Sequence, residues 1–452
     1  MEKSLPKMLV FICLLFCQVI QAQEMKETET KINFNGFIRL RMTQENNFNS
    51  WYGNFSDKSD NFLDARSYLS MSVTHGPVMG FISLDVAGND FTDGVEWGYP
   101  IYTPGVDEGP GFQNKWDINV RHLYVQYKGP FIAQIGRIPA GIGHNIIAHV
   151  NRDALRLIFP IQKQKLILVA IKGANDRLTL PESITTRAND DGAGDLNAFV
   201  GIFAYDFPSL LNSKGQVFAA KQQNTRENPF LPQYPGKLFL GITNDGKIGP
   251  IDYNLEAVSL TGETSVTPTS VLKDYSAYMA YLKVKYNTSG LFAPKAAFGM
   301  GSGDDKSTPN EVEDFQALFL DEGGHNYTNI FADDIHGFRY TDPLSVKYGS
   351  GFANVTWFQL GVDAKLLENK LNVEATFTAL KATDARTIGS GILGTNTGTT
   401  TSDIGTEIDL NFSYKLNEKL GLELRAGHFM PGDIFGDQNN VTKIELFTEF
   451  TF

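Results

Sequence analysis

The sequence ends with Val441-Thr-Lys-Ile-Glu-Leu-Phe-Thr-Glu-Phe-Thr-Phe452, and this stretch decides the fold. From Lys443 onward the residues alternate strictly between two sides. One row holds Ile444, Leu446, Thr448, Phe450 and Phe452, and the other holds Lys443, Glu445, Phe447, Glu449 and Thr451. A period of two places one row on each face of a β-strand. The segment is therefore predicted to be an amphipathic strand with one apolar face.

A strand of this kind that ends on an aromatic residue resembles the closing strand of bacterial outer-membrane β-barrels. In those proteins the terminal Phe forms part of the recognition signal for barrel insertion. The resemblance implies that the barrel assembly machinery is a partner and that it recognises Phe452. An ordinary exposed amphipathic strand is the alternative, and the other end of the sequence bears on the choice.

Residues 1–22 have the pattern of a secretory signal peptide. Lys3 and Lys7 supply the positive charge, residues 8–20 form the apolar segment, and Ala22 is a small residue suited to cleavage. Thirteen largely apolar residues are too few to cross a bilayer as a helix, since about 20 are needed. We therefore expect export of the mature chain from the cytoplasm.

After the signal peptide we expect a short periplasmic leader at residues 23–30 and one barrel domain at residues 31–452. Both cysteines, Cys13 and Cys17, lie in the signal peptide, so the mature chain has no disulfide, thiolate metal site or cysteine nucleophile. A net charge of −12 argues against nucleic-acid binding. No later segment approaches eighteen consecutive apolar residues, as expected when only every second residue faces lipid.

Period-two patterning predicts about eighteen strands. They fall near residues 31–43, 64–75, 78–89, 117–128, 131–138, 154–159, 165–172, 196–207, 215–221, 237–244, 250–261, 275–286, 292–302, 352–366, 370–381, 404–416, 420–430 and 442–452. Short connections alternate with long polar stretches such as 44–63, 139–153 and 303–351. Short periplasmic turns and long extracellular loops are typical of outer-membrane barrels. The fold class is therefore predicted to be an all-β transmembrane antiparallel barrel that is a monomer.

Several segments, in order and spacing, resemble the alginate-export family of outer-membrane porins. They are Asp64-Ala-Arg-Ser-Tyr-Leu-Ser70, Val120-Arg-His-Leu-Tyr-Val-Gln-Tyr127, Gly136-Arg137, Asn151-Arg-Asp153, Gly299-Met-Gly-Ser-Gly-Asp-Asp305, Gly405-Thr-Glu-Ile-Asp-Leu410 and His428-Phe-Met-Pro-Gly-Asp433. The resemblance implies an eighteen-stranded monomeric barrel with a narrowed, often arginine-rich lumen for anionic or sugar-like solutes. The inter-strand turns here are short, the longest being about 208–214. A long periplasmic plug loop is therefore not expected, and the resemblance does not carry over alginate itself as the solute.

Strand parity assigns several charged residues to the lumen. A charge facing lipid at mid-depth would cost about 2–4 kcal/mol, so these groups should face water. The predicted pore-lining residues are Arg39, Arg41, Arg66, Arg425, Asp85, Glu374, Glu407, Asp409 and Glu423. Arginine suits a transit path for anions because its fork binds carboxylate or phosphate bidentately. Alternatively, the arginines only pair with the lumenal acids and brace the wall. Strand alternation places Arg121 and Arg137 in the apolar rows of their strands. Charged residues at these positions require a bulge, a loop position or a different register.

Residues 139–153 are unusually apolar for an extracellular loop. Two interpretations are open: a constriction loop that folds back into the barrel, or a hydrophobic loop packed on its neighbours. His144, His149 and Arg152 are its candidate functional residues. The two histidines are five apart without a Cys or Glu-x-x-His pattern, so neither a metal nor a cofactor is expected.

The 303–351 stretch carries ten acidic residues without the spacing of a calcium-binding loop, which predicts a solvated acidic loop. With seven histidines and no Gly-x-Ser-x-Gly element, no enzymatic activity is expected. The predicted function is passive diffusion of small hydrophilic, anionic or sugar-like solutes. We expect the protein in the outer membrane of a Gram-negative bacterium, in contact with lipid and lipopolysaccharide. The alternatives are a polysaccharide export channel and a structural or surface-binding barrel with an occluded lumen.

Overall fold

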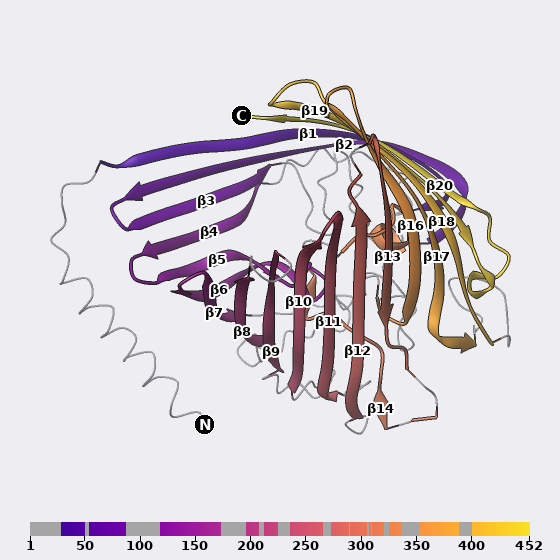
Figure 1. Cartoon of the computed structure of the whole chain (residues 1–452), viewed down its shortest axis with the longest axis horizontal. Coiled ribbons are helices and arrows are strands. Elements are labelled where there is room, and N and C mark those ends of the chain that lie inside the picture. Colours follow the sequence, from indigo (N-terminus) through magenta and orange to yellow (C-terminus); the bar gives the residue numbers. More distant parts are fainter. Residues whose placement is uncertain are drawn as a thin grey trace, which may run out of the picture.

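A computed structural model describes residues 29–49, 54–86, 118–172, 196–207, 212–224, 236–264, 273–288, 290–304, 307–308, 310–320, 325–335, 352–387 and 400–452. The signal-peptide and leader predictions fall almost entirely outside these residues. Within them the chain forms eighteen long strands that pair with their sequence neighbours in antiparallel register. Figure 1 shows the strands following one another around the wall in sequence order.

The eighteen wall strands are β1 (Lys31–Asn49), β2 (Asn54–His75), β3 (Val78–Val86), β4 (Ile118–Lys128), β5 (Ile132–Ile142), β6 (Ala148–Ile161), β7 (Gln164–Lys172), β8 (Leu196–Phe207), β9 (Ser213–Asn224), β10 (Gly236–Ile248), β11 (Ile251–Thr264), β12 (Lys273–Tyr286), β13 (Phe292–Gly301), β16 (Val355–Leu366), β17 (Leu371–Thr387), β18 (Thr400–Lys415), β19 (Leu420–Pro431) and β20 (Val441–Thr451). Between β13 and β16 lie the two-residue strands β14 (Glu311–Val312) and β15 (Phe319–Leu320) and the π-helix η2 (Phe331–Ile335). A 3-10 helix, η4 (Asp433–Phe435), precedes β20. No helix in the described residues is long and apolar enough to cross a bilayer.

The barrel closes because β1 pairs with β20 as well as with β2. The register joins Ile38 to Phe450 and Met42 to Leu446. Each pair places two apolar side chains on the outer face, where Met42 is 58% exposed and Phe450 is 43% exposed. Exposed apolar rows on the outer wall are what contact with lipid requires. The prediction of a closed eighteen-stranded barrel is therefore confirmed.

Two expected loops are shorter than the sequence suggested. The 44–63 stretch is mostly strand, because β1 and β2 continue as a ladder through Gln44–Asn61 and Asn46–Ser59 before the register shifts at Asn47. The 139–153 stretch is a hairpin in which β5 ends at Ile142 and β6 begins at Ala148. In both places the sequence no longer alternates between apolar and polar residues. The reason is that these parts of the strands do not have lipid on one face and water on the other.

The parity conflict at Arg121 is explained by a bulge. The β3–β4 register shifts between Ser83 and Leu84, opposite the step from His122 to Val120, so Arg121 has no direct partner on β3. A bulge of this kind adds one residue to the strand, and the side chain of that residue does not follow the regular alternation between the two faces of the sheet. Arg121 consequently reaches Asp85, with its Nη1 atom 3.1 Å from Oδ2.

Candidate functional site

The inner wall of the barrel has an apolar part and a charged part. On β7 to β9 the buried inner side chains include Ile171, Val200 and Phe218, each at most 3% exposed. These residues belong to one hydrophobic cluster that also contains Ile146 and Ile147 from the β5–β6 turn, which are fully buried. Large apolar side chains facing a lumen need a cover that excludes water. The β5–β6 hairpin supplies this cover.

The tip of that hairpin, residues 138–150, is called here the lumenal hairpin. Its His144 contacts β10 and β11, which are not neighbours of β5 or β6 in the sheet. The ring Nε2 atom lies 2.8 Å from Asp245 Oδ1, and Nδ1 lies 2.8 Å from Glu256 Oε2. The backbone N–H of His144 also donates to Glu256, at 2.7 Å. The hairpin therefore reaches through the barrel interior and is fixed to wall strands four and five positions beyond β6.

His144 is an imidazolium in this arrangement. Ionised carboxylates only accept hydrogen bonds, so both ring nitrogens must carry protons to bind Asp245 and Glu256. Burial by itself would lower the pKa of His144, but the hydrogen bonds and charges of Asp245 and Glu256 outweigh burial and raise that pKa to about 9. Gly143 permits the close approach, because its φ is +65° and a Cβ atom there would collide with the Glu256 carboxylate.

A second segment folds inward from the long connection between β13 and β16. Residues 325–335, called here the lumenal loop, bind the inner side of β18 through Glu407. This carboxylate is 0% exposed and accepts the backbone N–H groups of Ile330 at 2.7 Å and Phe331 at 2.9 Å. Tyr327 of the same loop stacks on Trp357 of β16, with ring centroids 4.1 Å apart.

The two inward segments also meet each other. β15, in the connection that carries the lumenal loop, pairs with β6 at Ala148 and His149. Tyr281 of β12 has His144 on one side at 5.7 Å and His325 on another at 4.7 Å between ring centroids. Burial, followed by the positive charges of His144 and Lys283, lowers the pKa of His325 to about 4. A neutral His325 and a charged His144 therefore face one tyrosine.

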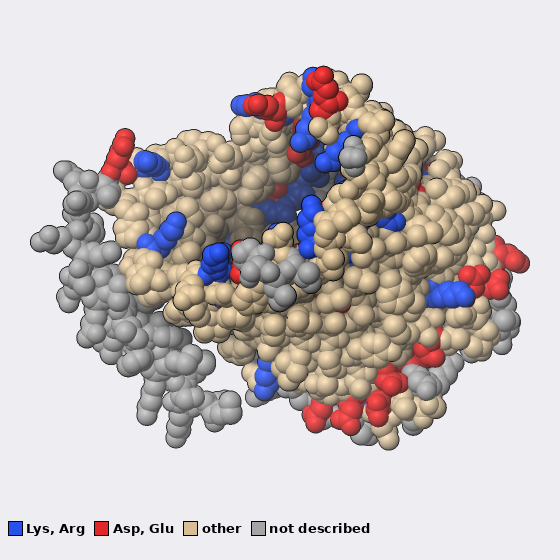
Figure 2. All heavy atoms as spheres, viewed as in Figure 1, with Lys and Arg blue, Asp and Glu red and all other residues tan. Residues whose placement is uncertain are grey.

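The predicted lumenal arginines are all engaged with carboxylates. Arg39 binds Glu449 at 2.6 Å and Arg41 binds Glu445 at 3.2 Å. Arg66 contacts Asp85 at 3.2 Å, and Arg425 contacts Glu423 at 2.6 Å. The ring of Phe447 lies within 4.7–6.0 Å of the guanidinium carbons of Arg39, Arg41 and Arg425. Figure 2 shows Lys and Arg side chains gathered in the central hollow of the molecule.

The remaining predicted site residues have different surroundings. Glu374 is bound by Lys295 at 2.6 Å, and Asp409, only 2% exposed, accepts the Asn329 N–H at 3.3 Å. The expectation that Glu407 and Asp409 face open water is corrected, because the lumenal loop covers them. His149 and Arg152 lie on β6, within and just beyond the lumenal hairpin, and are partly buried. Among the described residues no group of three or more potential ligands could hold a metal ion.

The prediction of a solvated acidic loop at 303–351 is wrong for part of that stretch. Asp314 is 1% exposed, and Asp333 pairs with Lys443 at 3.3 Å. Their segment lies against the inner wall, so these carboxylates need protein partners. Asp305, Asp321 and Glu322 lie outside the described residues.

Sequence reasoning missed a lysine–carboxylate cluster on β12, β13 and β16. Lys285 contacts Asp363 at 2.5 Å, and Lys295 contacts the same carboxylate at 2.7 Å. The parity of β12 could have identified it, because Lys283 and Lys285 alternate with Leu282 and Val284. The sequence also indicated the lumenal loop, because Ile330 and Phe331 are two adjacent apolar residues within an acidic stretch.

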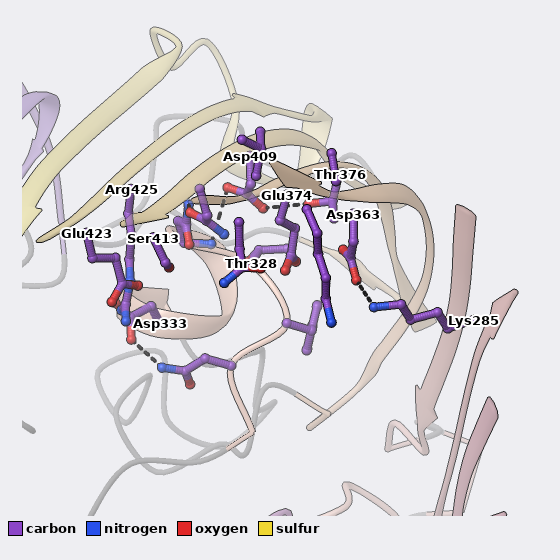
Figure 3. A pocket seen from close by; sticks show the side chains of 18 residues that line it. Lys285, Thr328, Asp333, Asp363, Glu374, Thr376, Asp409, Ser413, Glu423 and Arg425 are labelled. Carbon is purple, nitrogen blue, oxygen red and sulfur yellow. Dashed lines mark hydrogen bonds and ion pairs between the residues drawn. The ribbon is translucent and has the colours of Figure 1, made fainter. Parts of the chain in front are cut away.

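These charged groups border a cavity of about 570 Å³ between the lumenal loop and the inner wall of β12 and β16 to β19. Figure 3 shows Lys285 and Asp363 at one end and Arg425 with Glu423 at the other. Thr328, Thr376 and Ser413 lie between them. The cavity therefore presents polar groups along its whole length.

Known structures share this fold over nearly the full length. Pseudomonas aeruginosa OpdK with vanillate is 9% identical and superimposes with a TM-score of 0.55, covering 93% of this chain and 98% of that chain. P. aeruginosa OccK8 (OprE) is 11% identical with a TM-score of 0.57, and OccK9 (OpdG) is 9% identical with a TM-score of 0.57, both with the same coverage. No curated protein matches the sequence significantly.

The sequence profile described as alginate export matches residues 223–449, just over half of the 452-residue chain. The matched part runs from the last two residues of β9 through most of β20 and includes the connection that carries the lumenal loop. The expected family resemblance is thereby confirmed: this eighteen-stranded outer-membrane β-barrel belongs to the alginate export family.

Proposed function

We propose that the protein is a passive outer-membrane channel for small hydrophilic solutes, anionic or sugar-like in chemistry. The observation that carries this proposal is the polar cavity of about 570 Å³ beside the lumenal loop. Small-molecule sites have volumes of roughly 300–1,000 Å³. Several of the charged groups around this space are partly exposed, as expected for the polar wall of a water-filled passage.

The protein works as a filter in this proposal. The lumenal hairpin fills the apolar side of the barrel, and the lumenal loop narrows the charged side. Solutes then pass along a wall of ion pairs, amides and hydroxyls, where hydrogen-bonding partners replace the water that a solute loses. Small carboxylates of the kind named for OpdK, which was crystallised with vanillate, are reasonable first solutes to test.

Export of an anionic polysaccharide is the second candidate function, and family membership favours it. The two candidate functions differ in the size of the solute that can pass. The cavity suits one or two sugar units, whereas a polymer would require displacement of the lumenal loop.

Single-channel recording in a planar bilayer tests the proposal. We expect discrete conductance steps from the purified barrel and none from a heat-denatured sample. Liposome swelling then separates the two candidates: a monosaccharide should enter within the assay, while an oligosaccharide of about ten units should not. A silent bilayer with correctly folded protein would favour a structural barrel.

A further inference from the structure

Four of the five carboxylates that line the cavity beside the lumenal loop contact a cation. Lys285 and Lys295 both contact Asp363, at 2.5 and 2.7 Å, and Lys295 also contacts Glu374 at 2.6 Å. At the opposite end Arg425 contacts Glu423 at 2.6 Å. A solute that carried one charge would have to separate one of these pairs, or else sit beside a like charge.

The carboxylates that line the cavity outnumber the cations that line it. They are Asp333, Asp363, Glu374, Asp409 and Glu423, against Lys285, Lys365 and Arg425. The side chain of Glu374 is 43% exposed, whereas Lys295 is only 3% exposed. Glu423 is 34% exposed, close to the 39% of Arg425. An anion entering the cavity would therefore meet Glu374 before it could reach Lys295. This arrangement disfavours anions at this position.

Neutral hydrogen-bonding groups are left free to bind a solute. Within the described part of the chain, the Asn372 amide and the Ser413 hydroxyl make no hydrogen bond, and both line the cavity. Asn411 uses its Oδ1 atom to accept from Asn329, at 2.9 Å, which leaves its NH2 group available. An amide and a hydroxyl each offer both donors and acceptors, as the hydroxyls of a sugar do.

We propose that this cavity is a binding site for an uncharged polyhydroxylated solute about the size of a mono- or disaccharide. This inference rests on the proposed channel function and narrows its solute class. Asn372, Asn411 and Ser413 bind the hydroxyl groups. The ion pairs at the two ends accept or donate at the solute's edges without losing their partners.

The test compares three probes in single-channel recordings: maltose, which is neutral, glucuronate, which is an anion, and glucosamine, which is a cation. The inference predicts that maltose interrupts the current at the lowest concentration. In the double variant Asn372→Ala with Ser413→Ala, loss of two hydrogen bonds should raise the half-blocking concentration of maltose about tenfold.

A matched control removes the same two chemical groups elsewhere on the barrel. Asn33 and Ser72 form an amide–hydroxyl pair on β1 and β2, with Nδ2 and Oγ 3.4 Å apart, and neither lines the cavity. The double variant Asn33→Ala with Ser72→Ala should have the same half-blocking concentration of maltose as the wild type. Glucuronate or glucosamine acting at an equal or lower concentration than maltose would overturn the inference, as would an unaffected cavity variant.

Calorimetric titration of the detergent-solubilised barrel with maltose provides a readout that needs no conductance. Binding that is lost in the cavity variant but kept in the control supports the site even if the bilayer stays silent, in which case the channel proposal alone fails. Conductance without maltose binding in either assay would overturn the site and leave the channel.

Discussion

Phe452 closes the barrel on Gly36. The Phe452 N–H donates to the Gly36 oxygen at 3.0 Å, and the Gly36 N–H donates back at 3.2 Å. The phenyl ring lies over Gly36, where a Cβ atom would collide both with the ring and with the backbone oxygen of Tyr68. A glycine in β1 therefore receives the aromatic side chain that follows β20, and the ring stacks on Phe450 at 6.1 Å between centroids.

Deletion of Phe452 should reduce the yield of folded barrel. The deletion removes two backbone hydrogen bonds and the ring that covers Gly36, and it also removes the expected recognition residue for assembly. Gly36→Val should act in the same direction through the collision. The heat-modifiable fraction on gels measures both, and Leu416→Ala is a control because Leu416 is similarly exposed, 46% against 44%. Wild-type levels of the heat-modifiable form in the deletion would contradict this prediction.

Replacing residues 142–150 with a short Gly-Ser linker should raise the single-channel conductance. The hairpin tip occupies the lumen and buries Ile146 and Ile147 against the wall, so its removal widens the water-filled passage. Folding is checked by heat-modifiable mobility, because exposure of the apolar inner wall of β7 to β9 costs stability. If conductance stayed the same in a correctly folded variant, the hairpin would not limit the passage.

The attachment of the hairpin should weaken at high pH. The pKa of His144 is raised to about 9 from an ordinary value near 6.5, so protonation favours the attached state. This stabilisation is complete below about pH 6.5, declines as the pH rises, and is lost above about pH 9. The shift of the His144 pKa from 6.5 to about 9 corresponds to about 3 kcal/mol of stabilisation of the attached hairpin. His325 stays neutral across this range, because its pKa is lowered to about 4.

We therefore expect conductance to rise between pH 7 and pH 10 in the wild type. The variant His144→Phe should be more conductive at pH 7 and lose most of this pH dependence. His75→Gln is the control, because His75 bonds Thr30 at the turn end of the wall, away from the hairpin. An identical pH profile in wild type and His144→Phe would exclude His144 as the attachment point.

Changing Arg39, Arg41 and Arg66 together to Gln should move the reversal potential in a salt gradient toward cation preference. The substitutions remove the guanidinium contacts that these arginines make with Glu449, Glu445 and Asp85, and Asp85 keeps its contact with Arg121. Distant loop charges matter less, since charges are screened within about 8–10 Å at physiological salt.

The reciprocal triple variant provides the matched comparison for this experiment. Glu449→Gln, Glu445→Gln and Asp85→Asn together should shift the potential toward anions. If neither triple variant changes the reversal potential or solute flux while both fold, these ion pairs brace the wall and do not select solutes.

The sequence by itself determined the eighteen strands, their order and the inward or outward row of most residues. Strand periodicity is local: alternation in residues 404–416 or 442–452 is visible without knowing any partner. Turn length is local as well, which is why the short turns at 76–77 and 129–130 were recognisable. Family membership was also readable from the ordered segments between Asp64 and Asp433.

Only the tertiary structure decided what fills the lumen and which charges meet. His144 binds residues 101 and 112 positions away, and Glu407 is buried by backbone 77 positions before it. Such contacts depend on closure of the barrel and on the segments that fold inward from its wall. The alternation of apolar and polar residues along a strand predicts neither of these features. The ion pairs across the seam between β20 and β1, including Arg39 with Glu449, likewise exist only because the barrel closes there.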